Sequence, residues 1–250
     1  MKRKALVVGG ANGIGLAIAT ELAKREDYAI VYIVDKERVE EQYCHRKFQS
    51  IQFDLTCPDY SLFDSFKDVD TLMITAGFGS LSLFKNVQES YITSSFDVNA
   101  IAPIRVVHHF IDKLQGKEDF RCGIMGSIAG FMSSPFFAVY GATKAALKIF
   151  IESVNVELEA AGTTNRILNV SPGSIKGTKF SNSQTNLTLL LSLADEIIQH
   201  LEEKRDLLIP QYEEIFKEVL ERYHKDFRKE GRHSYEYKLN SNRMNIPLRK

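Results

Sequence analysis

The sequence predicts an α/β protein built on a doubly wound parallel sheet. Short runs rich in β-branched residues recur along the 250-residue chain, and apolar segments with a helical period separate them. These runs are nearly all apolar instead of alternating, which is typical of strands that are buried on both faces. Strands of this kind, joined by helical crossovers, form parallel sheets. A hydrophobic content of 44% allows one large core, so we expect a single domain.

Seven segments carry the strand pattern, and helical segments lie between them. The predicted strands are residues 4–10, 29–35, 48–54, 70–77, 121–127, 166–173 and 206–210. Residues 13–26 and 140–162 place apolar side chains at steps of three and four, which indicates helices. Gly162 is the expected C-cap of the second helix. Another helix is expected over 191–204, after a polar stretch at 179–186 that has no period.

The last part of the chain predicts an extra C-terminal helix. Seven apolar side chains recur at helical steps between Gln211 and Gly231, namely Tyr212, Ile215, Phe216, Val219, Leu220, Tyr223 and Phe227. We expect this helix to pack on its own domain or on a sister subunit. The polar and basic residues beyond Gly231 are expected to be loosely ordered or to wrap a neighbour.

Composition excludes several classes of function. The chain has 32 basic and 32 acidic residues, which removes the electrostatic reason to expect nucleic-acid or membrane-surface binding. Cys44, Cys57 and Cys122 are too widely spaced for a disulfide framework or a zinc cluster, and we expect no metal site. No apolar run approaches the roughly 18 residues that span a bilayer. The first apolar run is also too short for a signal peptide, so a cytoplasmic protein is expected.

The turn after the first predicted strand is a candidate anion site. In VVGGANGIG, Gly9, Gly13 and Gly15 join the strand to a helix. Glycine lets the backbone approach a pyrophosphate closely, and the positive end of a helix dipole favours this anion. A tight turn without any ligand is nearly as common for such a cluster. Asp35 adds weight to the nucleotide interpretation, because it ends the next strand, where a carboxylate can accept hydrogen bonds from ribose hydroxyls.

Asp35 also predicts which dinucleotide binds. A carboxylate at this place repels the 2′-phosphate that distinguishes NADP from NAD. The sequence therefore predicts NAD as the preferred cofactor. Lys36 follows directly, and its positive charge could partly compensate a phosphate.

Tyr140 and Lys144 form the candidate catalytic pair. Four residues apart on a predicted helix, they share one face with Cβ atoms about 5–6 Å apart. A neighbouring ammonium would stabilise a phenolate and lower the tyrosine pKa from its usual value near 10. An isolated pair of this kind is more often a packing tyrosine beside a solvated lysine. Ser127 ends a buried strand 13 residues upstream, at the sheet edge where ligands bind, which favours a site.

At this point the chain resembles the short-chain dehydrogenase/reductase family, with its Rossmann-type fold. GGANGIG is similar to the glycine motif of that family, DLT at 54–56 to its adenine-contacting segment, and TAG at 75–77 to its second glycine turn. DVNA around Asn99, GSIAG, YGATK and SPGSIKGT resemble its asparagine helix, serine strand, catalytic pair and nicotinamide segment. The resemblance covers residues 4–178 in the right order and spacing.

The resemblance implies a role for each matching residue. Tyr140 would exchange a proton with the substrate oxygen, and Lys144 would lower its pKa and hold the nicotinamide ribose. Ser127 would bind the carbonyl or alcohol, and Asn99 would hold a water that relays protons. The implied cofactor-binding residues are Gly9, Asn12, Gly13, Ile14, Gly15, Asp35, Asp54, Leu55, Ala76, Gly77, Tyr140, Lys144, Pro172, Gly173 and Ile175.

Three places depart from the family pattern. Val8, Ile74 and Thr75 replace a threonine and two asparagines that link central strands, and we expect Val8 to pack on Ile74 instead. Thr178 comes one residue later than the usual threonine, so its contact with nicotinamide is doubtful. The third departure is the C-terminal extension.

The single domain 1–250 is thus expected to comprise a cofactor-binding and catalytic core at 1–178, a substrate loop and helix at 179–205, and the last strand, C-terminal helix and tail at 206–250. We predict an NAD(P)-dependent oxidoreductase that interconverts an alcohol and a ketone or aldehyde, and a homodimer. An apolar substrate pocket is indicated by Phe78, Phe131, Phe136 and Phe137, although a core role for two or more is equally consistent. The alternative is a catalytically silent NAD-binding regulatory or scaffold protein of the same fold.

Overall fold

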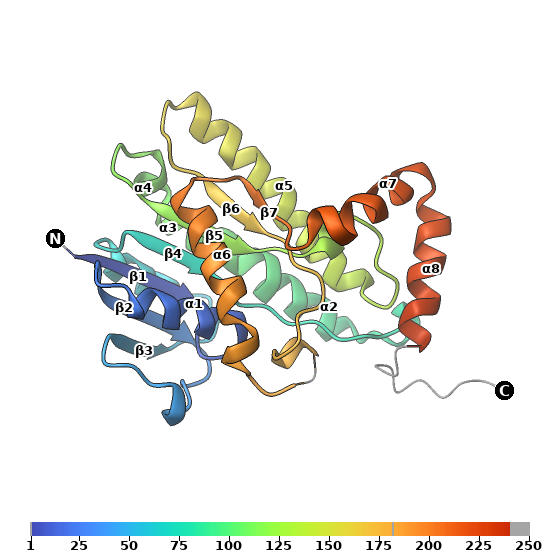
Figure 1. Cartoon of the computed structure of the whole chain (residues 1–250), viewed down its shortest axis with the longest axis horizontal. Coiled ribbons are helices and arrows are strands. Elements are labelled where there is room, and N and C mark those ends of the chain that lie inside the picture. The colour runs from blue at the N-terminus through green and yellow to red at the C-terminus, as the bar shows by residue number, and fades with distance from the viewer. Residues whose placement is uncertain (1, 182, 241–250) are drawn as a thin grey trace.

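The strands form one parallel sheet, as predicted. The computed structural model describes residues 2–181 and 183–240. Within them, a seven-stranded sheet has the order β3-β2-β1-β4-β5-β6-β7, and every neighbouring pair is parallel (Figure 1). The strands are β1 Arg3–Val8, β2 Tyr28–Asp35, β3 Phe48–Gln52, β4 Thr71–Ile74, β5 Arg121–Met125, β6 Ile167–Val170 and β7 Leu207–Leu208. Each lies inside or overlaps a predicted strand segment.

Helices cover both faces of this sheet. They are α1 Gly13–Lys24, α2 Glu89–Phe96, α3 Ala102–His109, α4 Ile111–Gln115, α5 Ala138–Ala160, α6 Leu191–Glu202, α7 Lys217–Lys225 and α8 Phe227–Asn240. Helices α1 and α6 pack in one hydrophobic cluster, and α3 and α5 pack in another on the opposite face of the sheet. Along β1, Ala5 and Val7 enter the first cluster, whereas Leu6 and Val8 enter the second. Alternate residues thus fill two cores, which explains why the strand is apolar throughout.

The strand order reverses between β1 and β4, and this point positions the site. The chain leaves β1 toward β2 and β3 on one side, then crosses to β4, β5 and β6 on the other. Ligands of doubly wound sheets bind at the carboxyl ends of the strands beside this switch point. The glycine turn after β1 lies there.

The centre of the sheet combines apolar packing with one polar link. Val8 and Ile74 are register partners and both are buried, so the predicted packing between them is confirmed. The Thr75 hydroxyl also donates to the carbonyl oxygen of Gly9 at 2.9 Å. A polar connection between the two central turns is therefore kept, which the sequence patterns did not predict.

The predicted C-terminal extension is helical, but it is divided into two helices, α7 and α8, instead of one. Asp226 interrupts the helix with extended backbone, at φ −155° and ψ 92°. Its carboxylate then accepts hydrogen bonds from the backbone N–H groups of Arg228 and Lys229, both at 3.0 Å, and so caps α8.

The expectation of a loose tail directly after Gly231 was wrong. Gly231 lies inside α8, which continues to Asn240. A Cβ on Gly231 would lie 3.2 Å from the Ser133 hydroxyl oxygen, so this glycine marks close packing and not a helix end. The part of the prediction that concerns residues 241–250 lies outside the described residues.

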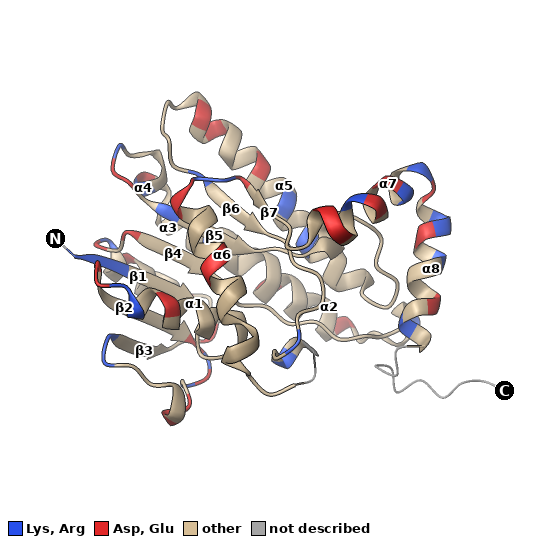
Figure 2. Cartoon of the chain, in the orientation of Figure 1, with Lys and Arg blue, Asp and Glu red and all other residues tan. Residues whose placement is uncertain are grey.

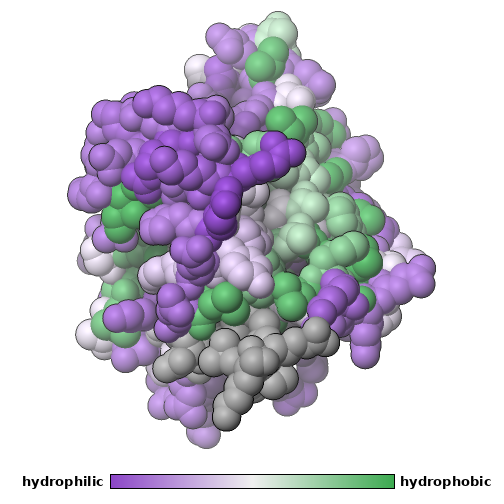
Figure 3. All heavy atoms as spheres, turned by 90° about the vertical axis from the view of Figure 1, so that its right-hand side faces the viewer, coloured by the Kyte–Doolittle hydropathy of each residue, from purple (hydrophilic) through white to green (hydrophobic). Residues whose placement is uncertain are grey.

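Charged residues of both signs lie along the outer helices. Basic and acidic residues are interspersed along the helices, including α7 and α8 (Figure 2). On the side of the molecule that carries α7 and α8, hydrophilic residues form a broad area and hydrophobic residues lie in several places beside it (Figure 3). Among the described residues, none of the helices combines the length and the hydropathy that crossing a membrane requires.

Candidate active site

Close backbone packing requires two glycines of the first turn. Gly9 has a φ of +86°, and a Cβ there would lie 2.3 Å from the backbone nitrogen of Ala76. At Gly15, a Cβ would lie 2.3 Å from the carbonyl oxygen of Gly9. A side chain at either position would push the turns after β1 and β4 apart. Ala76, a predicted cofactor residue, thus lies directly against the glycine turn.

The start of α1 has the features of an anion site. Its first turn contains no acidic residue, and Asn12 makes no side-chain hydrogen bond to the helix. The Asn12 amide instead donates to Glu37 Oε2 at 3.3 Å, while the Gly13 N–H donates to the Thr185 hydroxyl at 3.1 Å. Ile14 packs partly buried against the α1 and α6 core. Because glycine has no side chain, the backbone at this helix N-terminus allows the pyrophosphate of a dinucleotide to approach closely.

The Asp35 carboxylate is fixed beside this turn. Its Oδ2 accepts the backbone N–H of Ala11 at 3.0 Å, and its Oδ1 accepts that of Glu37 at 3.1 Å. Each carboxylate oxygen has a second lone pair that remains usable for a ribose hydroxyl. Asp35 therefore fits the ribose-binding role that the sequence predicts.

The predicted adenine segment lies at the same edge. Phe53 donates its N–H to the Asp35 carbonyl oxygen at 2.9 Å, and Asp54 and Leu55 follow in the chain. The N–H and hydroxyl of Thr56 both donate to Asp54, at 2.9 and 2.8 Å, and these bonds lower the pKa of Asp54. The carboxyl ends of β2 and β3 therefore bring Asp35 and this segment to one side of the sheet.

The segment after β6 contacts both the serine strand and the C-terminal region. The carbonyl oxygen of Pro172 accepts the N–H of Ile128 at 3.1 Å. A Cβ on Gly173 would lie 2.6 Å from the Phe216 ring, so Phe216 closes over this segment. Ile175 is packed against the α1 and α6 core. The three predicted residues thus lie together beyond the carboxyl end of β6.

Asn99 lies in a π turn at the base of the site. This turn, Asp97–Ile101, joins α2 to α3 and contains the fully buried Asn99. The Asn99 Oδ1 accepts the N–H of Phe78 at 2.9 Å, and its Nδ2 donates to the Phe78 carbonyl oxygen at 2.8 Å. A Cβ on Gly77 would lie 3.2 Å from Asn99 Oδ1 and 3.4 Å from Lys144 Nζ. Asn99 and Lys144 therefore face the second glycine turn from two helical segments.

Tyr140 and Lys144 share one buried face of α5. The two side chains are nearly inaccessible, and Lys144 Nζ lies 5.7 Å from the centre of the Tyr140 ring. Lys144 Nζ donates to the carbonyl oxygen of Met125, at the end of β5, at 2.8 Å. Ser127 follows two residues later and lies near Tyr140, where its side chain acts to lower the Tyr140 pKa. The structure thus brings these three predicted catalytic residues together.

The predicted lowering of the Tyr140 pKa by Lys144 was wrong for this arrangement of side chains. Burial raises the pKa of Tyr140 to about 12, and the nearby Ser127 side chain opposes this rise only in part. Burial also lowers the pKa of Lys144 to about 8. The ammonium is bound to the Met125 carbonyl oxygen, so desolvation dominates at both groups.

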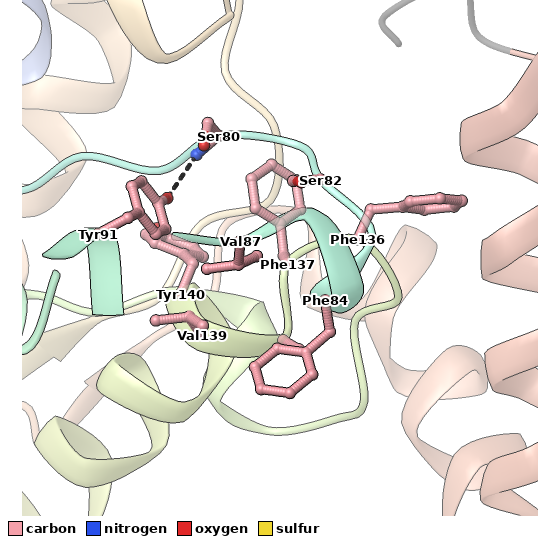
Figure 4. Close-up of a pocket in the computed structure, with 10 residues that line it drawn as sticks. Ser80, Ser82, Phe84, Val87, Tyr91, Phe136, Phe137, Val139 and Tyr140 are labelled. Carbon is pink, nitrogen blue, oxygen red and sulfur yellow. Dashed lines mark hydrogen bonds between the residues drawn. The ribbon is translucent and has the colours of Figure 1, made fainter. Parts of the chain in front are cut away.

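A small cavity adjoins Tyr140. It is lined by Ser80, Ser82, Phe84, Val87, Tyr91, Phe136, Phe137, Ala138, Val139 and Tyr140 (Figure 4). Its volume of about 10 Å³ has room for about one water molecule. The Tyr91 hydroxyl accepts the N–H of Ser80 at 2.9 Å, so a second phenol is held in this wall.

Two of the four predicted pocket phenylalanines line this cavity. Phe136 and Phe137 do so, whereas Phe131 packs with the small cluster around Ile128. Phe78 packs edge-on against Tyr91, with ring centres 5.7 Å apart. Phe136 and Phe137 therefore have the predicted pocket role, whereas Phe131 and Phe78 have a packing role.

The loop after β6 covers the site from outside. The Phe180 ring stacks on Phe137, with centres 5.8 Å apart, and lies 5.1 Å from the Tyr140 ring. A Cβ on Gly79 would lie 2.9 Å from Phe180, so the ring is closely packed. In the same loop, the Thr185 hydroxyl lies on the N–H at the start of α1. This position supports the predicted substrate loop, whose role stays a prediction.

Helix α8 braces the outer wall of the cavity, which sequence reasoning missed. Tyr235 stacks on Phe136, with ring centres 4.6 Å apart, and Phe136 points toward α8 (Figure 4). Lys238 Nζ donates to the Ser134 hydroxyl at 2.7 Å and to the Pro135 carbonyl oxygen at 2.9 Å. No motif in the sequence predicts these contacts, because the partners are far apart along the chain.

Metal ligands are not grouped in the part of the chain that the structure describes. Within residues 2–181 and 183–240, no three or more His, Cys, Asp or Glu side chains are arranged to hold a metal ion.

Comparison with known proteins finds a family of similar sequences. A family described as short chain dehydrogenase matches residues 3–188. The uncharacterized oxidoreductase YvaG of Bacillus subtilis is 28% identical over 181 residues, which are 69% of this chain and 68% of that protein. Homo sapiens 17-beta-hydroxysteroid dehydrogenase type 1 is 27% identical over 185 residues, covering 67% of this chain and 56% of that protein. The 7beta-hydroxysteroid dehydrogenase of Clostridium sardiniense is 28% identical and covers 68% of each chain.

Solved structures share the fold at lower sequence identity. The short-chain dehydrogenase from Sphingobium yanoikuyae in complex with NADPH has a TM-score of 0.73 at 18% identity, and the match covers 99% of each chain. ElxO with NADP bound has a TM-score of 0.69 at 20% identity, covering 84% of this chain and 97% of that one.

Proposed function

Because the chain belongs to the short-chain dehydrogenase family, we propose that it interconverts an alcohol and a ketone or aldehyde with NAD as cofactor and Tyr140 as acid/base. The observation that carries this proposal is the buried group of Tyr140, Ser127 and Lys144 at the carboxyl end of β5. The glycine turn with Asp35 lies at the same edge of the sheet. A protein that only binds a nucleotide has no use for a buried phenol and a buried lysine together.

The roles follow from the chemistry of each group. When bound, NAD(H) supplies the hydride donor or acceptor. Tyr140 gives its phenolic proton to the substrate oxygen during reduction and takes it back during oxidation. Ser127 holds that oxygen through a hydrogen bond. Lys144, with a pKa of about 8, can release and regain a proton close to neutral pH and so restore the phenol.

The preference for NAD rests on carboxylates at the ribose edge. Asp35 is anchored there by two backbone N–H groups, and Glu37 lies beside Asn12. Lys36 is near Asp54, where its charge helps to lower the pKa of that carboxyl. We expect kcat/KM to be at least about tenfold higher with NAD than with NADP, which corresponds to about 1.4 kcal/mol.

The test is a turnover screen in both directions with NADH absorbance as the signal. Small aliphatic alcohols and ketones and hydroxysteroids belong in the panel, since two relatives are named hydroxysteroid dehydrogenases. Turnover supports the reaction, and the ratio of kcat/KM values for the two cofactors tests the preference. NADH binding without turnover of any substrate would instead favour the silent NAD-binding protein.

A homodimer is the expected assembly. Helix α5 exposes Ile149 and Val156 by 60% and 66%, two turns apart on one face, and Ile101 on the adjacent π turn is 46% exposed. Exposed apolar side chains grouped in this way favour a protein interface. Light scattering is expected to give twice the 28.4 kDa of one chain. The double variant Ile149→Glu and Val156→Glu should be a monomer, and a monomeric wild type would contradict the expectation.

A further inference from the structure

An ion pair crosses the ribose edge of the proposed cofactor site. Lys179, from the loop after β6, pairs with Glu37, which follows β2. The Glu37 carboxylate also accepts the Asn12 amide at 3.3 Å, and the Glu37 N–H donates to Asp35 Oδ1 at 3.1 Å. Three segments distant in sequence thus meet beside the carboxylate that is expected to bind the ribose.

The position of Lys179 is set by its neighbour in the sequence. Phe180 is held against Phe137 and Tyr140 and packs closely on Gly79. The backbone of Lys179 is therefore placed next to a residue that packs in the site, and its side chain pairs with Glu37.

A second connection ties the same loop to the nucleotide side. The Tyr43 hydroxyl, from the segment between β2 and β3, donates to the Thr185 carbonyl oxygen at 3.0 Å. The Thr185 hydroxyl accepts the Gly13 N–H at 3.1 Å. The loop thus crosses from the catalytic phenol to the glycine turn, and Lys179 lies on this path.

We propose that the Glu37 and Lys179 pair determines cofactor selection, with Glu37 occupying the donors that would otherwise bind a 2′-phosphate. The Asn12 amide and the Lys179 ammonium are both hydrogen-bond donors, as a phosphate requires. Both are engaged by Glu37. A 2′-phosphate next to Asp35 has to displace this carboxylate and meets its negative charge, whereas the hydroxyl of NAD does not. This inference rests on the proposed function and names a selecting residue for it.

The expected magnitude is moderate, because the pair is exposed. The side chains of Lys179 and Glu37 are 51% and 43% accessible, so solvent and salt screen their charges. Neutralising Glu37 removes a negative charge that repels the 2′-phosphate. It also frees the positive charge of Lys179 to attract the phosphate. Each of these two changes is expected to raise the affinity for the 2′-phosphate several-fold. Together they are expected to tighten NADPH binding about tenfold.

The experiment measures dissociation constants of NADH and NADPH by calorimetry with the full chain. Glu37→Gln is expected to tighten NADPH binding about tenfold and to change NADH binding by less than about threefold. Adding Lys179→Met should reduce the gain to about threefold, and about 0.5 M NaCl should reduce it strongly. Glu41→Gln is the matched control, because this exposed carboxylate follows the same strand and takes no part in the ion pair with Lys179.

The possible outcomes distinguish a failure of this inference from a failure of the proposed function. NADH binding by the wild type with an unchanged NADPH affinity in Glu37→Gln would overturn the inference alone. An equal gain in Glu41→Gln would overturn it too, because a general change of net charge would then explain the effect. A wild type that binds neither dinucleotide would overturn the proposed function and this inference together.

Discussion

Replacing Tyr140 by phenylalanine is expected to lower kcat by about 10²–10⁴-fold while leaving NADH binding within about threefold of the wild type. The substitution removes only the hydroxyl, which is the group that exchanges a proton with the substrate oxygen in the proposed reaction. The ring, which packs on Phe137 and Phe180, is retained. Steady-state kinetics on the best substrate of the screen gives kcat, and calorimetry gives the affinity for NADH.

Tyr91 provides the matched control for this substitution. It is the other phenol that lines the cavity, and its hydroxyl accepts the N–H of Ser80. Tyr91→Phe removes the same atom from the same cavity and is expected to lower kcat by less than about tenfold, because that hydroxyl is already engaged by the backbone. Equal losses in both variants would argue against Tyr140 as the acid/base. Unchanged turnover in Tyr140→Phe would exclude that role.

The strands were predictable because both faces of the sheet are covered. Continuous apolar runs such as residues 29–35 arise when alternate side chains enter two cores, and no other arrangement explains them as simply. The division at Asp226 was not predictable from the same apolar pattern, which continues through it. Asp226 caps the following helix with its own carboxylate, and Gly231 is required by contact with Ser133. Gly231 could have ended a helix, but its contact with Ser133 gives it a packing role inside α8.

The candidate site also contains residues that the sequence predicted and residues that only the structure reveals. Tyr140 and Lys144 lie close together because four residues separate them on one helix, and Asp35 is placed by the end of its strand. Phe180 and Tyr235 contact the site because of how a loop and α8 pack in the folded chain. The spacing of residues in the sequence does not predict these contacts. The pKa values depend on burial, which a sequence gives only as an average tendency.

Replacing Lys144 by methionine is expected to abolish turnover and yet to stabilise the fold by about 1–3 kcal/mol at pH 7. Burial lowers the pKa of Lys144 from 10.5 to about 8, so a charged lysine in the folded chain costs about 3 kcal/mol relative to the unfolded chain. Methionine has a similar length and no charge to desolvate. The loss of the hydrogen bond to the Met125 carbonyl oxygen offsets part of the gain, roughly 1 kcal/mol or more.

The pH dependence gives the sign of this effect independently. Between pH 8 and 10.5 the unfolded lysine keeps its proton while the folded lysine has lost it, so the wild type gains stability as pH rises through this window. The raised pKa of Tyr140, about 12, acts in the opposite direction only above about pH 10. Urea unfolding at about pH 7.5 and about pH 9.5 is therefore expected to show the advantage of Lys144→Met shrinking with pH.

Lys148→Met serves as the control, one turn further along α5. Lys148 forms an exposed ion pair with Glu152, and its removal is expected to change the unfolding free energy by less than about 1 kcal/mol with no loss of turnover. A destabilised Lys144→Met would show that the lysine is held by contacts stronger than its desolvation. A gain that did not depend on pH would mean that packing of the methionine, and not removal of the buried charge, is responsible.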